Sequence, residues 1–86
     1  GNSEVLMSGV ELMTNIVEEG GQVVVLNNSL METLRIRWLY IDGRLIGEDE
    51  VDGERIELRA PTAQGIYLLE MTGLNGETRY EKVVVR

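Results

Sequence analysis

The chain has 86 residues, no cysteine and no histidine, and its 8 basic and 15 acidic side chains give a net charge of −7. One domain of this length can build only a modest core, and here no disulfide supports it. The absence of histidine removes the commonest general base and metal ligand, and the acidic balance excludes the basic stripe that nucleic-acid binding needs.

Turn signals divide the sequence into short segments rich in valine, isoleucine, leucine and tyrosine, a pattern typical of β-strands. The apolar spacing within residues 10–18 fits either a helix or a strand, and we favour a strand. Residues 34–41 and 44–48 form either one bent strand or a hairpin about Asp42-Gly43, which leaves about seven strands in total. The predicted strands are residues 4–8, 10–18, 22–27, 34–41, 44–48, 54–59, 65–73 and 77–86.

The central run 34–38 (LRIRW) alternates strictly between apolar and charged residues, which indicates a strand with one face in the core. We therefore expect Trp38 to be largely buried. Arg35 and Arg37 share the opposite face, where they either pair with cross-strand acids or bind an acidic partner. We favour the cross-strand pairs.

The last segment, 64–86, predicts a hairpin about Asn75-Gly76. A two-residue loop would place Glu70 opposite Glu81, which is unfavourable, so we favour a three-residue loop that pairs Glu70 with Lys82. Alternate residues of the final strand then point inward and outward: Val83 and Val85 into the core, Val84 and Arg86 to the outside. Together these segments predict one domain over residues 1–86, an all-β, immunoglobulin-like antiparallel β-sandwich.

Three motifs in the second half resemble a known family. They are residues 38–46 (WLYIDGRLI), residues 64–71 (QGIYLLEM) and residues 81–86 (EKVVVR). In this order they are similar to the C-terminal sorting domain of cargo proteins of the type nine secretion system. The family's aspartate before its Gly-Arg turn would fall at Tyr40, and residues 1–33 match no motif of the family. A small secreted immunoglobulin-like family of unknown function is the neighbouring resemblance.

This resemblance implies an immunoglobulin-like module that an outer-membrane translocon and a surface protease recognise. The implied partners are proteins of the secretion machinery, and the implied location is the periplasm in transit, then the cell surface or the medium. The residues that the resemblance assigns to partner recognition are Gly43, Arg44, Gly65, Tyr67, Lys82, Val83, Val84, Val85 and Arg86. The alternative is a stand-alone secreted or surface binding module with an unknown ligand.

Catalytic, cofactor and metal sites are not predicted. No serine has a histidine or lysine base nearby in the sequence, and no glycine-rich phosphate loop follows a strand, so we expect no enzyme activity. The acidic run 48–54 lacks the spacing of a calcium loop, and we expect a solvated loop between two strands instead of a metal site. No apolar run is long enough for a transmembrane helix, so membrane insertion is not expected either.

Overall fold

The computed structural model describes residues 10–27, 33–73 and 76–86, and these residues form eight strands and no helix. No helix in this part of the chain is long and apolar enough to cross a membrane. The predicted strand 4–8 lies outside the described residues. In chain order the strands are β1 (Val10–Leu12), β2 (Ile16–Val17), β3 (Gln22–Asn27), β4 (Leu34–Tyr40), β5 (Leu45–Val51), β6 (Arg55–Arg59), β7 (Gly65–Thr72) and β8 (Thr78–Val85).

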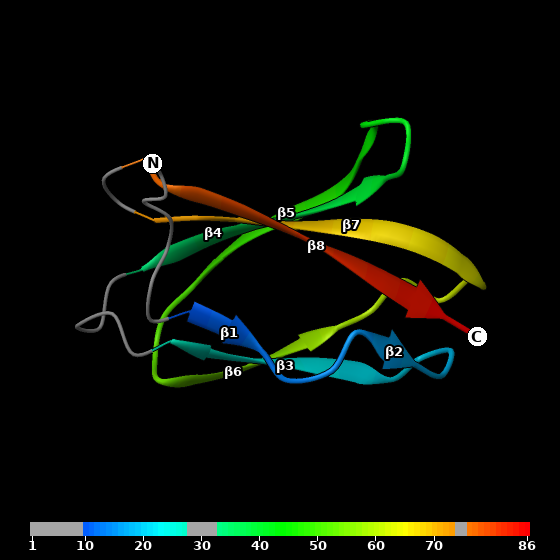
Figure 1. The fold of residues 1–86 in the computed structure, drawn as a ribbon, viewed down its shortest axis with the longest axis horizontal. Helices are drawn as coiled ribbons and strands as arrows, with labels where there is room; N and C mark the ends of the chain where they lie inside the picture. The colour runs from blue at the N-terminus through cyan, green and yellow to red at the C-terminus, as the bar shows by residue number, and fades with distance from the viewer. Residues whose placement is uncertain (1–9, 28–32, 74–75) are drawn as a thin grey trace, which may run out of the picture.

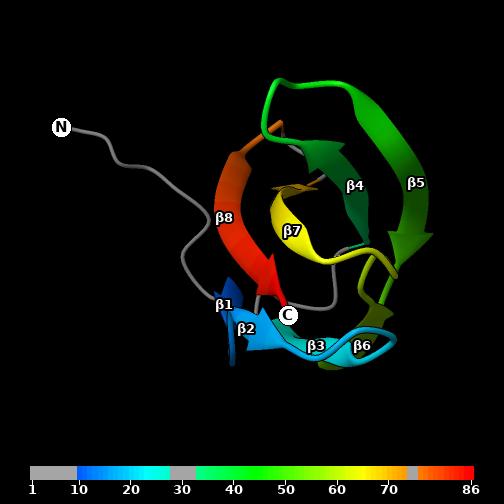
Figure 2. The same cartoon turned by 90° about the vertical axis from the view of Figure 1, so that its right-hand side faces the viewer.

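The strands, labelled in Figure 1, form two sheets that face each other, as the end-on view in Figure 2 shows. One sheet has the order β1-β3-β6 and the other has the order β2-β8-β7-β4-β5. Neighbouring strands are antiparallel except β2 and β8, which are parallel. The prediction of an all-β sandwich is therefore confirmed.

The core lies between the sheets and takes alternate side chains from their inner faces, as the period of two in a strand requires. Leu34 and Ile36 on β4 are buried as the alternation predicts, and Tyr67, Leu69 and Met71 on β7 are buried as well. The other buried members of this core come from the remaining strands and the turn after β6: Val10, Val17, Val23, Val25, Ile56, Leu58, Ala60, Val83 and Val85.

The prediction of one strand over residues 10–18 is wrong. Two short strands occupy this stretch and belong to different sheets, β1 pairing with β3 and β2 with β8. Between them the hydroxyl of Thr14 exchanges hydrogen bonds with the backbone of Ile16, which interrupts the extended chain. The crossing allows Val10 and Val17 to reach the same core from opposite layers.

The predicted strand 44–48 is too short, because residues 48–51 of the acidic run belong to the strand, and only residues 52–54 connect it to β6. The chain turns at Asp42-Gly43, where Gly43 has a φ of 94°, and returns as β5 up to Val51. Arg35 and Arg37 lie opposite Glu50 and Glu48 in the β4–β5 ladder. These cross-strand pairs favour the extension of β5 to Val51, beyond the predicted end at residue 48.

The predicted register of the last hairpin is also wrong, by two residues. Glu70 lies opposite Tyr80 and not Lys82, because the ladder closes at Gly73, whose N–H donates to the carbonyl of Glu77 at 2.8 Å. Gly76 has a φ of 87°, so it supplies the left-handed position that a three-residue hairpin loop requires at its end. A shift of two residues keeps every side chain on its face. The inward positions of Val83 and Val85 are therefore confirmed.

Trp38 is half-buried, where we predicted a largely buried ring. It points to the inner face of its sheet and packs against the core. Its cross-strand neighbour on β5, however, is Gly47, which has no side chain to cover the ring. A register shift between Trp38 and Leu39 interrupts the ladder at the same place. The indole therefore stays accessible from the side of the sandwich.

Candidate functional site

The C-terminal end of β8 forms backbone hydrogen bonds with other segments of the chain along both of its edges. β7 pairs with one edge along the whole strand. On the other edge, the N–H of Val84 donates to the carbonyl of Asn15 at 2.8 Å, and the N–H of Arg86 donates to the carbonyl of Val17 at 3.0 Å. The N–H of Glu19 donates in turn to the carbonyl of Arg86 at 3.2 Å. Residues 84–86 are thus fixed in a defined conformation, and no free sheet edge remains there.

Three of the nine residues that the resemblance assigned to partner recognition are core residues. Val83 and Val85 are buried, and Tyr67 is 5% exposed. The hydroxyl of Tyr67 donates to the carbonyl of Ala63 at 2.7 Å, which ties the turn after β6 to the start of β7. A Cβ on Gly65 would lie 3.5 Å from this hydroxyl, in ordinary contact. These side chains hold the fold and are not exposed to a partner.

Gly43 and Arg44 lie in the exposed turn between β4 and β5. The backbone N–H of Arg44 donates to Asp42 Oδ1 at 3.0 Å, and its Nε donates to Oδ2 at 2.8 Å. The backbone bond, helped by the guanidinium, lowers the pKa of Asp42. The Arg44 guanidinium also lies 4.6 Å from the centre of the Tyr40 ring. The turn is therefore held in one shape by its own side chains.

The remaining predicted residues form a surface with neighbours that the sequence analysis did not select. Lys82 and Arg86 are exposed and Val84 is half-buried on the outer face of the five-stranded sheet. In the ladder Val84 lies between Ile66 and Ile16, and Lys82 lies opposite Leu68. We call this surface the β8 patch, and it consists of Ile16, Ile66, Leu68, Lys82, Val84 and Arg86.

The β8 patch combines apolar exposure with positive charge. Ile16 and Ile66, on either side of Val84, are 48% and 46% exposed. Lys82 has no ion pair within the described part of the chain, and Arg86 pairs with Glu18 at 3.1 Å in full solvent. Residues 65–71 carried a usable signal, because apolar residues occupy both alternating faces of that run. The contribution of Ile16 depends on the β2–β8 pairing and has no local signal.

The other half of the same outer face is charged, and its acidic and basic side chains pair with one another. Glu70 accepts a hydrogen bond from the Tyr80 hydroxyl at 2.8 Å and pairs with the Arg37 guanidinium at 3.3 Å. The bond to Glu70 raises the pKa of Tyr80, since ionising the phenol would place two negative charges side by side. Arg35 pairs with Glu48 at 3.5 Å. These pairs are the cross-strand contacts that we favoured for Arg35 and Arg37.

A groove runs along the side of the sandwich where β5 and β6 face each other. It consists of two adjoining hollows of about 270 and 380 Å³, which share Trp38 and Arg59. Its lining is mainly apolar. We call it the lateral groove, and its principal apolar residues are Trp38, Tyr40, Ile46, Val51, Leu58 and Pro61.

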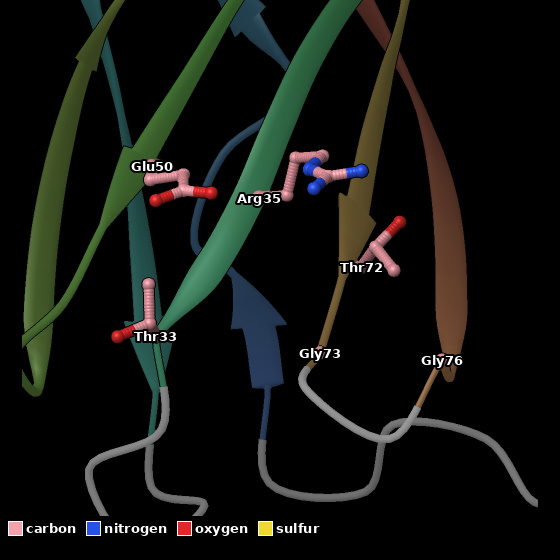
Figure 3. A pocket seen from close by; sticks show the side chains of 6 residues that line it. All are labelled: Thr33, Arg35, Glu50, Thr72, Gly73 and Gly76. Carbon is pink, nitrogen blue, oxygen red and sulfur yellow. The ribbon is translucent and has the colours of Figure 1, made fainter.

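Another hollow of about 280 Å³ lies near the β7–β8 turn (Figure 3). Arg35 extends from β4 toward Thr72 on β7, and Glu50 comes from β5 on the other side of β4. The hydroxyls of Thr33 and Thr72 have no lysine or histidine base in this lining. Among the described residues, no group of carboxylates is placed to hold a metal ion. In β5 successive carboxylates point to opposite faces and cannot converge on one cation.

Comparisons with protein-family models and with curated proteins found no match to this chain.

Proposed function

We propose that this domain is a non-catalytic export and sorting module that protein partners recognise. The observation that carries the proposal is the β8 patch, in which two exposed isoleucines flank the terminal strand and Lys82 has no ion pair within the described residues. An apolar surface with a free cation suits an interface with a partially acidic, apolar protein surface. The partners in this proposal are an outer-membrane translocon and a surface processing protease.

Strand order supports the immunoglobulin-like part of the proposal. In constant-type immunoglobulin domains strands A, B, E and D share one sheet and C, F and G share the other, and variable-type domains add strands C′ and C″ to the second sheet. Here β1, β3 and β6 correspond to A, B and E, and β4, β7 and β8 correspond to C, F and G, whereas β5 lies beside β4 like C′ and not in the first sheet like D. The Tyr67 hydroxyl bound to the backbone four residues upstream matches the tyrosine corner of such sandwiches. Our proposal is therefore an immunoglobulin-like module.

The conformation of residues 84–86 supports recognition of the folded domain. Their backbone is bonded on both edges, so a partner would read side chains that are displayed outward and would not add a strand at this position. This restricts the recognition residues of the final strand to Lys82, Val84 and Arg86. The proposed location follows from the role: the periplasm in transit, then the cell surface.

The test uses a reporter protein fused to the domain in a bacterium with a type nine secretion system. Lys82→Ala together with Arg86→Ala should leave the reporter in the periplasm, because both cations of the β8 patch are lost. Both side chains are exposed, so the free energy of unfolding should change by only about 0.5–1 kcal/mol. Circular dichroism of the purified domain should confirm that it stays folded.

The matched control is Arg55→Ala together with Arg59→Ala on β6, which removes the same charge from exposed positions of the other sheet. This control should be exported normally. Normal export of the Lys82/Arg86 variant would contradict the sorting role, as would retention of the wild-type fusion. The stand-alone binding module would then be the better account, and the lateral groove is the surface that favours it.

A further inference from the structure

We propose that the lateral groove binds an extended, basic peptide segment by strand addition. This inference does not depend on the sorting role, because it concerns the opposite side of the sandwich from β2 and β8 (Figure 2). It rests on three independent features of the groove: free strand edges, an uncovered apolar floor and a concentration of negative charge.

The first feature is the pair of strand edges that border the groove. β5 ends the five-stranded sheet and pairs only with β4, whereas β6 ends the other sheet and pairs only with β3, within the described strands. A peptide that lies along either edge in an extended conformation can form main-chain hydrogen bonds with it. The two free edges meet the lining of the same groove.

The second feature is the apolar floor at Trp38. Gly47 lies opposite Trp38, and a Cβ built on Gly47 would have no atom within 4 Å. Ile46 is 38% exposed, and Pro61 is half-buried at the other end of the groove. A peptide side chain placed over Gly47 would therefore bury the indole and gain apolar contact.

The third feature is charge. Residues 48–59 contain six carboxylates and two arginines, so this stretch holds much of the chain's net negative charge. The lining of the hollow beside β5 holds three carboxylates, Glu48, Asp49 and Glu57, against one cation, Arg59. Glu48 is ion-paired with Arg35 and Glu57 with Arg55, each at 3.5 Å, whereas Asp49 has no ion pair within the described residues. A lysine- or arginine-bearing peptide is attracted to this lining, whereas an acidic one is repelled.

The same features disfavour two other occupants. A second copy of the chain would bring another acidic wall against this one, which costs electrostatic free energy. A neutral sugar would stack on the open indole of Trp38, but it would gain nothing from the free strand edges or from the net negative charge of the lining. An extended basic peptide uses all three features.

The probe is a short, blocked peptide in which lysine alternates with valine. Trp38 is the only tryptophan, so its emission reports occupancy of the groove directly. We expect saturable binding that shifts Trp38 emission to shorter wavelength and weakens as ionic strength rises. The same peptide with glutamate in place of lysine should not bind.

Two variants test the charge and the floor of the groove. Asp49→Asn with Glu57→Gln should weaken binding about fivefold to tenfold, because it removes two carboxylates from the lining. The matched control, Glu11→Gln with Glu19→Gln, removes two exposed charges outside the groove and should weaken binding less than about twofold. Gly47→Val should abolish binding by filling the space over Trp38 while the domain stays folded.

A peptide methylated on alternate backbone nitrogens tests strand addition, since it keeps the charge but cannot donate along one edge. We expect it to bind at least tenfold more weakly. Equal affinity of this peptide, equal losses in the two acid-to-amide variants, or unchanged binding to the Gly47→Val variant would each overturn the proposal. So would a Trp38 response to a neutral oligosaccharide with none to the peptide. A dimer in sedimentation that Gly47→Val dissociates would assign the groove to a second copy and overturn it as well.

Discussion

The two lateral sides of the sandwich differ in how the backbone groups at their strand edges are paired. On the side of β1 and β2, which we call the closed side, the chain passes from one sheet to the other and β2 pairs with β8. The guanidinium of Arg79 on β8 also donates to the carbonyl of Val10 on β1. On the side of β5 and β6, the open side, no described strand covers either edge.

Because of this difference, one side of the sandwich contributes to stability, and the other side stays available to a binding partner. The closed side pairs residues 84–86 with residues 15–19 by backbone hydrogen bonds and buries Val17 and Val85 at the junction. The open side leaves its edge groups to solvent and carries carboxylates at Glu48, Asp49 and Glu50, which discourage pairing with other acidic edges. The lateral groove therefore lies on the side that can accept a new strand without breaking an existing one.

The largest expected effect concerns the core that the two sides share. Leu69→Ala removes a fully buried side chain from the centre of β7, and we expect it to cost about 2–5 kcal/mol of unfolding free energy. Urea unfolding followed by circular dichroism and by Trp38 emission should give one coincident transition. Leu68→Ala, on the outer face, is the control and should cost less. Two separated transitions would mean that the open side unfolds on its own.

The next effect compares equivalent losses on the two sides. Val85→Ala on the closed side should cost about 1.5–3 kcal/mol, because Val85 is 2% exposed. Ile46→Ala on the open side should cost less than about 1 kcal/mol, since that side chain is partly in solvent. Denaturant melts of both variants would measure the ratio. Equal losses would remove the distinction between a closed and an open side.

A smaller effect of opposite sign is expected at the open side. Gly47→Val should stabilise the domain by about 0.5–1 kcal/mol, because valine loses less backbone freedom than glycine and prefers a strand. The site has open space and an ordinary φ, so no strain opposes the change. Thermal melts would detect the gain, and a shift of Trp38 emission to shorter wavelength should accompany it. A destabilised variant would show that the space over the indole is already filled.

The smallest effect is a local pH dependence at the β4–β5 turn. The pKa of Asp42 is lowered below its usual value of 3.8, first by the backbone N–H of Arg44. Its contribution to stability is therefore present above that value and lost as the pH falls through the lowered pKa. A carboxyl titration by NMR should give a midpoint below the usual one, while amide signals of residues 84–86 stay unchanged. A midpoint at or above the usual value would contradict the turn geometry.

The fold class, and which side chains of a strand point into the core, could be predicted because both depend on the local alternation of apolar and polar residues. Leu34, Ile36, Val83 and Val85 point inward as their period of two indicates. These inward positions were predicted correctly although the register of the last hairpin was wrong, because a shift of two residues keeps every side chain on its face. The end of β5 was missed because acidic residues have low strand propensity, and cross-strand arginines override that preference.

The site could be predicted only in part, because its parts come from distant segments. Lys82, Val84 and Arg86 were selected from the final motif, and their exposure was read from alternation. Ile16 lies beside these residues only because the two-residue strand β2 pairs with β8, and no local sequence pattern predicts that strand. The lateral groove has no sequence signature at all, since it depends on which two sheet edges meet.

The parallel pairing of β2 with β8 has a consequence for the time at which the domain folds. Glu18 and Arg86 are 68 residues apart, and their segments must meet before the closed side exists. During synthesis from the N-terminus, this ladder cannot form until residue 86 has left the ribosome. Contacts of such long separation also form slowly because closing a long loop costs entropy. The closed side therefore stays unpaired in a nascent chain until residues 84–86 have been made.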